Sequence, residues 1–145
     1  MLIPLQPERL YWTCCIRKSD SMRIASLGSG SRGNATLVQH EDTTLLVDNG
    51  FSLRQFTQRL DRFQIEPDSI DAVLLTHEHG DHSGGIERLC RNHDIPLWTA
   101  VGTARAALAP HFHYHRLVAG LTVTIGGIEV MPITVPHDAS EPLQF

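Results

Sequence analysis

Residues 76–82 read Thr-His-Glu-His-Gly-Asp-His, and the position of this stretch decides the fold. Residues 71–75 before it form a short apolar run that is typical of a buried strand. After it come Ser83-Gly84-Gly85 and then a run that predicts the start of a helix. The polar stretch therefore lies on a loop at the carboxyl end of a strand, where open α/β sheets bind their ligands.

The stretch concentrates side chains that bind metal ions. Neutral imidazole and carboxylate oxygen are ligands of Zn²⁺ and of similar divalent cations. On an extended segment His77 and His79 share one face, and a tight turn at Gly80 can bring Asp81 and His82 round from the other side. This geometry favours two adjacent metal ions over one. The helical motif of zinc proteases does not fit, because Asp81 stands where the second histidine is needed. A polar loop without ligands is the alternative interpretation.

Length and composition indicate one globular domain. The chain has 145 residues and a net charge of −4, and Lys18 is its only lysine, so no basic groove for nucleic acid is visible. Three cysteines make no disulfide framework, which favours a reduced, cytoplasmic setting. No apolar run approaches the roughly 20 residues of a membrane span, so no membrane partner is expected.

The pattern along the chain predicts alternating strands and helices. Residues 1–21 show no clean period and are expected to form a disordered extension before a domain that covers residues 22–145. Strands are expected at 23–27, 34–38, 44–48, 71–75 and 97–100, helices at 52–62, 85–93 and 103–108, a hairpin of 121–125 with 128–135, and the start of another strand at 143–145.

The glycines of residues 28–33 resemble a dinucleotide-binding fingerprint, since Gly28-x-Gly30-x-x-Gly33 is followed about 20 residues later by Asp48. That fingerprint needs a helix directly after the glycines, so that its N-terminus can meet the pyrophosphate. The residues that follow are instead β-branched and typical of a strand. The glycines are therefore expected to let a loop bend tightly near the metal site.

Two further groups of histidines lie downstream. His111, His113 and His115 are expected on one face of an extended segment, where such a spacing can hold zinc, but no carboxylate accompanies them. A solvated strand face is the favoured interpretation of this group, with a second zinc site as the alternative. His137 follows the predicted strand 128–135, so it is delivered at a strand end in the same way as the central stretch.

Several motifs together resemble those of the metallo-β-lactamase superfamily. The central one is His77-x-His79-x-Asp81-His82 after an apolar strand. Residues 45–50, Leu-Leu-Val-Asp-Asn-Gly, resemble the first motif of that family, and residues 135–139, Val-Pro-His-Asp-Ala, resemble the third. Residues 25–34, Ala-Ser-Leu-Gly-Ser-Gly-Ser-Arg-Gly-Asn, are similar to the bacterial YycJ-like subgroup.

The resemblance implies an α/β fold, the αβ/βα sandwich of two similar halves, of which this chain covers little more than the first half. It also implies a set of metal ligands. These are His77, His79 and His137 for a first ion and Asp81 and His82 for a second. Asp48 is expected to brace the ligand loop by hydrogen bonds, which is how residues behind a metal site orient its ligands.

The implied activity is hydrolysis by water that is activated on one or two ions, with Zn²⁺ favoured and Mn²⁺ or Fe as alternatives. Asp81 is the expected catalytic group, because it can hold or accept a proton of that water. The subgroup implies phosphodiester hydrolysis, with a nucleic-acid exonuclease as one form of it, whereas small-molecule esters are the alternative substrates. The second hypothesis is a catalytically incomplete, metal-binding half-domain. Such a half-domain is expected to dimerise through its uncovered sheet face or to need the missing half.

Overall fold

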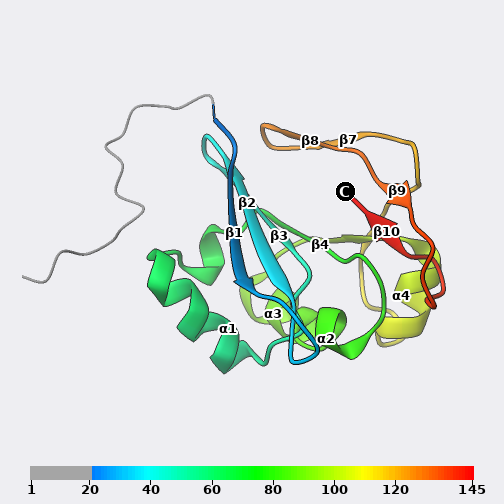
Figure 1. Ribbon diagram of the computed structural model, residues 1–145, viewed down its shortest axis with the longest axis horizontal. Coiled ribbons are helices and arrows are strands. Elements are labelled where there is room, and N and C mark those ends of the chain that lie inside the picture. The colour runs from blue at the N-terminus through cyan, green and yellow to red at the C-terminus, as the bar shows by residue number, and fades with distance from the viewer. Residues whose placement is uncertain (1–20) are drawn as a thin grey trace, which may run out of the picture.

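A mixed sheet of six strands is the frame of the structure, a computed structural model that describes residues 21–145 (Figure 1). Across the sheet the strands follow chain order: β1 (Arg23–Gly28), β2 (Ala35–His40), β3 (Thr43–Val47), β4 (Ala72–Leu74), β5 (Leu97–Thr99) and β6 (His115–Arg116). Strands β1 to β3 pair antiparallel, and β3 to β6 pair parallel. The loops that leave the parallel strands therefore gather at one edge of the sheet. The extension expected over residues 1–21 lies, apart from Ser21, outside the described residues.

Helices connect the parallel strands, and each of them was predicted from the sequence except the short helix Gly80–Ser83, where a tight turn was expected. They are α1 (Leu53–Leu60), α2 (Gly80–Ser83), α3 (Ile86–His93) and α4 (Val101–Ala107), with 3-10 turns at Asp61–Phe63 and Pro67–Ser69. Helix α1 begins with a capping box, in which the Ser52 hydroxyl accepts from the backbone N–H of Gln55 and the Gln55 side chain accepts from that of Ser52. Within residues 21–145, no helix combines the length and the apolar character needed to cross a membrane.

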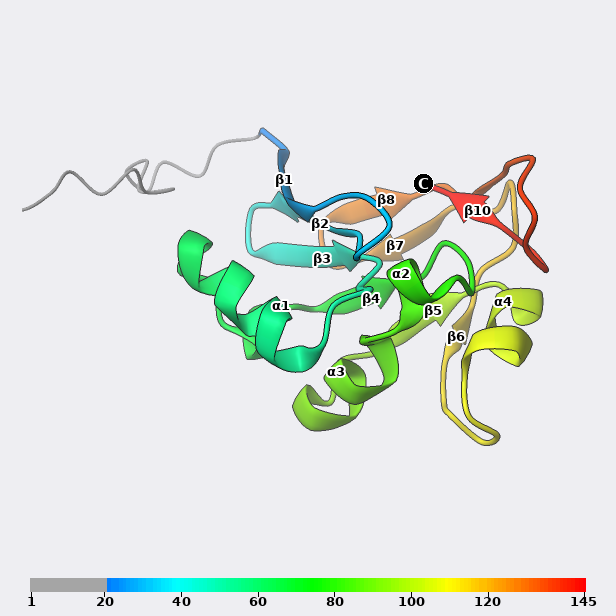
Figure 2. The same ribbon diagram turned by 60° about the horizontal axis from the view of Figure 1, so that its bottom comes forward.

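Both faces of the sheet bury apolar side chains, because the residues of each strand alternate between them. Helices α1 and α3 cover the first face, and a hairpin of β7 (Val123–Ile125) and β8 (Ile128–Val130) covers the second (Figure 2). Pairing in register places Ala25, Leu37 and Leu46 in one row on the first face. The neighbouring row on the second face holds Ile24, Val38 and Leu45. The hairpin buries Leu45, whereas Ile24 at the sheet edge is 66% exposed.

The strand predicted over residues 128–135 is interrupted, so that prediction is wrong in its extent. Strand β8 ends at Val130, and a separate strand β9 (Ile133–Thr134) pairs with β10 (Leu143–Gln144). Pro132 lies at the break, because proline has no backbone N–H to continue the pairing with β7. Its carbonyl instead accepts from the N–H of Gly120 (2.8 Å). The break turns the chain away from the hairpin and toward the ligand loop.

The glycine segment after β1 forms a turn, as the sequence predicted. The backbone N–H of Gly33 donates to the carbonyl of Gly30 (3.0 Å), and the two residues have φ values of 143° and 117°. Residues other than glycine rarely adopt such φ values. Strand β2 begins at Ala35, so no helix follows the glycines and the requirement of a dinucleotide site is not met.

We expect Gly50→Ala to lower the free energy of unfolding by about 1–3 kcal/mol, the usual range for overpacking. A Cβ atom at Gly50 would lie 1.9 Å from the backbone oxygen of Asp81, where the loop after β3 touches α2. Gly80→Ala is the matched control, because a Cβ atom there meets nothing within 4 Å. Urea unfolding followed by circular dichroism measures both variants. Equal unfolding midpoints for the two would contradict the close packing at Gly50.

Candidate metal centre

Three histidines from two loops converge at the carboxyl edge of the parallel strands. His77 and His79 follow β4, and His137 follows β9. One nitrogen atom of each ring lies within 4.8 Å of the others, and within residues 21–145 no other group of three or more His, Cys, Asp or Glu meets this test. The Nε2 atoms of His77 and His137 are 3.3 Å apart. His77 is buried and His137 is exposed, so the cluster opens toward solvent on the His137 side.

This donor set fits zinc. Three imidazole nitrogens with one position left open make up the ligand set of a common kind of catalytic zinc site. Two nitrogen ligands of a tetrahedral zinc ion, each about 2.0–2.1 Å from it, lie about 3.3–3.4 Å apart. The Nε2 atoms of His77 and His137 already have this separation of 3.3 Å, whereas the widest separation in the cluster, within 4.8 Å, must shorten by more than about 1 Å through ring movement.

Asp48, at the end of β3, is the buried anchor behind this cluster. Its φ of 60° is in the left-handed region, which aspartate adopts more readily than most residues. Its carboxylate accepts hydrogen bonds from the backbone N–H of Thr76 (2.8 Å), the Thr76 hydroxyl (2.8 Å) and Nδ1 of His82 (2.7 Å). These contacts join Asp48 to the ligand loop, and its bracing role stays a prediction.

The bonds of Asp48 decide which nitrogen of two histidines is available as a ligand. A carboxylate can only accept, so the Thr76 hydroxyl donates to Asp48 and its oxygen accepts from Nδ1 of His77 (2.8 Å). His82 donates from Nδ1 directly to Asp48. Both rings therefore carry their proton on Nδ1 and present the lone pair of Nε2, as metal-binding histidines do when a hydrogen bond orients them.

The pKa values of His77 and His82 shift in opposite directions. Burial, assisted by the nearby His82, lowers the pKa of His77 below its ordinary value, which favours the neutral form that binds metal. The hydrogen bond to Asp48 raises the pKa of His82. His77 is therefore the more readily deprotonated ring of this pair.

Asp81 and His82 form the second group of predicted ligands, on the short helix α2. The Oδ2 atom of Asp81 lies 3.6 Å from Nε2 of His82. Asn34, from the glycine turn after β1, donates its side-chain amide to the same Oδ2 atom (3.0 Å). The sequence placed Asn34 at the end of a subgroup motif and at the start of the strand predicted over 34–38, and no local pattern indicated that it would meet Asp81.

The loop that carries His137 is tied to the ligand loop by residues that sequence reasoning missed. The carboxylate of Glu78 accepts from the backbone N–H (2.7 Å) and the hydroxyl (2.8 Å) of Ser140. The next residue, Glu141, accepts from the backbone N–H of Gly102 at the start of α4 (2.7 Å). Glu78 lies within the quoted ligand stretch, so its position was visible, but its partner lies 62 residues away along the chain.

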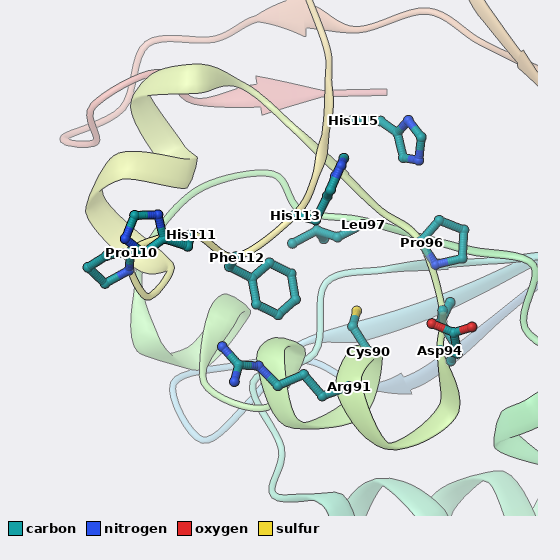
Figure 3. A pocket seen from close by; sticks show the side chains of 11 residues that line it. Cys90, Arg91, Asp94, Pro96, Leu97, Pro110, His111, Phe112, His113 and His115 are labelled. Carbon is teal, nitrogen blue, oxygen red and sulfur yellow. The ribbon is translucent and has the colours of Figure 1, made fainter.

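The second histidine group lies elsewhere. His111, His113 and His115 line a pocket of about 620 Å³ between α3 and the starts of β5 and β6, at the opposite ends of the strands from the ligand loops (Figure 3). The expectation of one extended segment is wrong, because His111 sits in a turn with a φ of 70° and only His115 belongs to a strand. All three are exposed, which agrees with the solvated interpretation.

Comparison with known proteins places the chain in a family. A sequence profile of the metallo-beta-lactamase superfamily matches residues 28–143. The chain belongs to this superfamily. Exodeoxyribonuclease WalJ of Streptococcus pneumoniae is 33% identical over 127 residues, which cover 83% of this chain and 47% of WalJ. Exodeoxyribonuclease YycJ of Bacillus anthracis is 32% identical over 129 residues, or 86% of this chain and 49% of YycJ. The YycJ-like resemblance is thus confirmed.

A solved structure supports the same fold. MEM-A1, a subclass B3 metallo-beta-lactamase from a soil metagenome library, superposes with a TM-score of 0.70 at 20% identity, over 83% of this chain and 52% of that protein. The expected metallo-β-lactamase fold is confirmed, and the chain spans about half the length of the curated relatives it matches.

We expect Asp48→Asn to weaken zinc binding by about 10–100-fold, the usual effect of changing a residue that orients metal ligands. Asparagine keeps the shape and tolerates the left-handed backbone, but its amide lacks the charge and one of the two acceptor oxygens that serve Thr76 and His82. Isothermal titration of the chain with Zn²⁺ measures the change. Asp61→Asn, at an exposed carboxylate after α1, is the control. Equal affinities of the two variants would count against the bracing role.

Proposed function

We propose that this chain is the metal-binding part of a hydrolase that cleaves phosphodiester bonds, with DNA as the first substrate to test. The observation that carries the proposal is the convergence of three imidazoles from two loops beside the Asp81–His82 pair. The substrate class rests on the relatives, which are named exodeoxyribonucleases. The net charge of −4 adds no support for a nucleic-acid substrate, and small-molecule esters are the alternative.

The proposed ligands divide into two groups. His77, His79 and His137 hold a first ion, and Asp81 with His82 contributes to a second. An all-imidazole first group favours Zn²⁺, and the carboxylate of Asp81 makes Mn²⁺ or Fe acceptable alternatives at the second. The cytoplasmic setting inferred from the cysteines also stays a proposal. Cys90 is a free thiol whose pKa burial raises to about 12, and it lines the pocket at the opposite ends of the strands from the ligand loops.

Zinc at this site would supply a hydroxide ion at neutral pH, because it lowers the pKa of bound water from 15.7 to about 7. The residues of the chain supply orientation and proton transfer. Asp48 sets the ring nitrogens of His77 and His82, and Glu78 keeps the His137 loop against the ligand loop. In this proposal the carboxylate of Asp81 holds or accepts the proton of the attacking water, as a general base does.

His79→Ala is expected to abolish high-affinity zinc binding, because two imidazoles are too few to retain the ion. Zinc affinity is measured by titration calorimetry. Hydrolysis is measured with bis(p-nitrophenyl) phosphate and with an end-labelled single-stranded DNA in the presence of Zn²⁺ or Mn²⁺. His93→Ala is the matched control, since His93 lies on α3 and bonds Asp68. A His79→Ala chain that binds zinc as tightly as the wild type would refute the ligand assignment.

A second candidate is a metal-binding half-domain without activity of its own. The observation that favours it is the 47% of WalJ that this chain spans. Zinc binding by the wild-type chain without hydrolysis of either phosphodiester would support this candidate, whereas turnover that is lost in His79→Ala would support the hydrolase.

We also propose that a second copy of the chain covers the apolar side chains left exposed on the hairpin side of the sheet. Ile24, Met131 and Ile133 have exposed fractions of 66%, 56% and 48%. Burial of exposed apolar side chains against a second copy removes them from water, which is the main driving force of protein association. Sedimentation velocity is expected to show a dimer that Ile133→Asp dissociates and that Asn92→Asp, on α3, does not. A wild-type chain that sediments as a monomer at about 100 µM, a concentration at which a dimer with a Kd of that order would be populated, would overturn this proposal.

A further inference from the structure

Asn34 connects the glycine turn to the second ligand pair. Its backbone N–H donates to the carbonyl of Asp81 (2.7 Å), and its carbonyl accepts from the N–H of Gly50 (3.1 Å). The segment between β1 and β2 is thereby joined both to α2 and to the loop after β3. These two hydrogen bonds fix the backbone of Asn34 and therefore the position from which its side chain extends.

The orientation of the Asn34 side chain follows from its neighbours. Its Oδ1 atom accepts from the backbone N–H of Gly30 (2.9 Å). Its Nδ2 atom faces two backbone carbonyls, those of Gly30 (3.2 Å) and Asp81 (3.3 Å). A flipped amide would place oxygen against these carbonyls and would point its NH₂ group at the N–H of Gly30, so the amide has one favourable orientation.

The same Nδ2 atom also lies between the two predicted ligand atoms. It is 3.0 Å from Oδ2 of Asp81 and 3.1 Å from Nε2 of His82. Because His82 carries its proton on Nδ1, toward Asp48, its Nε2 accepts a hydrogen bond here. Nδ2 thus has four acceptors within 3.3 Å but only two hydrogens to share among them.

This excess of acceptors has a consequence for a cation. The two ligand atoms are 3.6 Å apart, a separation that one zinc ion at about 2.0–2.2 Å from each can span. When an ion takes both atoms, the two amide hydrogens of Asn34 still have the carbonyls of Gly30 and Asp81 as partners. Asn34 can therefore release both ligand atoms without losing its own hydrogen bonds.

We propose that Asn34 is a positioning residue of the second metal site, resting on the proposed metal-dependent function. By hydrogen bonds its amide holds Oδ2 of Asp81 and Nε2 of His82 close together before an ion binds. When the ion binds, both atoms exchange these hydrogen bonds for bonds to the ion. Alanine at this position removes that restraint. Aspartate keeps the acceptor for Gly30 but replaces the NH₂ group by an oxygen, which stands beside both ligand atoms and can bind the ion itself.

The test is a zinc titration of the full chain, labelled with ¹⁵N in its histidine rings and followed by NMR. In the wild type the signals of His77, His79 and His137 are expected to respond first and that of His82 at higher zinc. Asn34→Ala is expected to raise the zinc concentration needed for the His82 response by about tenfold, at the lower end of the range for residues that orient ligands. Asn34→Asp is expected to lower it, because a carboxylate adds a ligand.

The outcomes separate this proposal from the proposed function. If zinc does not perturb His77, His79 and His137 in the wild type, the metal-dependent function fails, whatever Asn34 does. If these three histidines respond normally, the titration of His82 decides the positioning role. The role is overturned if His82 shows no zinc response in the wild type or if its midpoint is unchanged in Asn34→Ala. It is also overturned if both variants shift the His82 midpoint in the same direction. Asn92→Ala, at an exposed asparagine on α3, is the control, and thermal unfolding of each variant shows that it is folded.

Discussion

The buried carboxylate of Asp48 is the interaction on which the rest of the site depends. Asp48 is only 5% exposed, and burying a carboxylate costs free energy unless hydrogen-bond donors surround it. Here the donors are the backbone N–H and hydroxyl of Thr76 and the ring of His82. One acceptor thus orders the start of the ligand loop and the helix that follows it. Through Thr76 it also reaches His77, so a single anion orients two imidazoles.

Asp48 reaches this position because β3 and β4 are parallel neighbours. Their register pairs Val47 with Leu74, so the residues directly after both strands emerge side by side, and the N–H of Asp48 donates to the carbonyl of Leu74 (2.9 Å). The loops can then approach closely only where no side chain intervenes. A Cβ atom at Gly85 would lie 1.9 Å from the backbone oxygen of Phe51, which is the same constraint that applies at Gly50.

Within residues 21–145 the chain holds one cluster of three histidines and one Asp–His pair, and it spans about half the length of its curated relatives. The Asp81–His82 pair offers two ligand atoms where the histidine cluster offers three, so the residues that orient the pair matter more. A pair of ligands binds an ion weakly, so any contact that keeps the two atoms close has a large effect on affinity. The amide of Asn34 is in a position to do this. It comes from a third loop, the one between the antiparallel strands β1 and β2.

Sequence alone determined the features that depend on short-range pattern. The apolar strand before residue 76, the helix that starts near residue 52, the turn of the glycines and the spacing of His77, His79, Asp81 and His82 all follow from residues close together along the chain. The family motifs, which are also local strings, led to His137 and Asp48. The strand, the helix and the glycine turn were predicted correctly because hydrogen bonds within an element and alternation between faces repeat over a few residues, whereas the roles of the site residues stay predictions.

Only the tertiary structure decided the contacts between distant loops. The pairing of Glu78 with Ser140 and of Asn34 with Asp81 and His82 joins segments separated by 47 to 62 residues, and no local pattern encodes such partners. The break at Pro132 and the turn at His111 were likewise misjudged, because alternating apolar or histidine residues indicate an extended strand whether or not a partner strand is present. Strand pairing and loop convergence are properties of the whole sheet, so they appear only when the chain is folded.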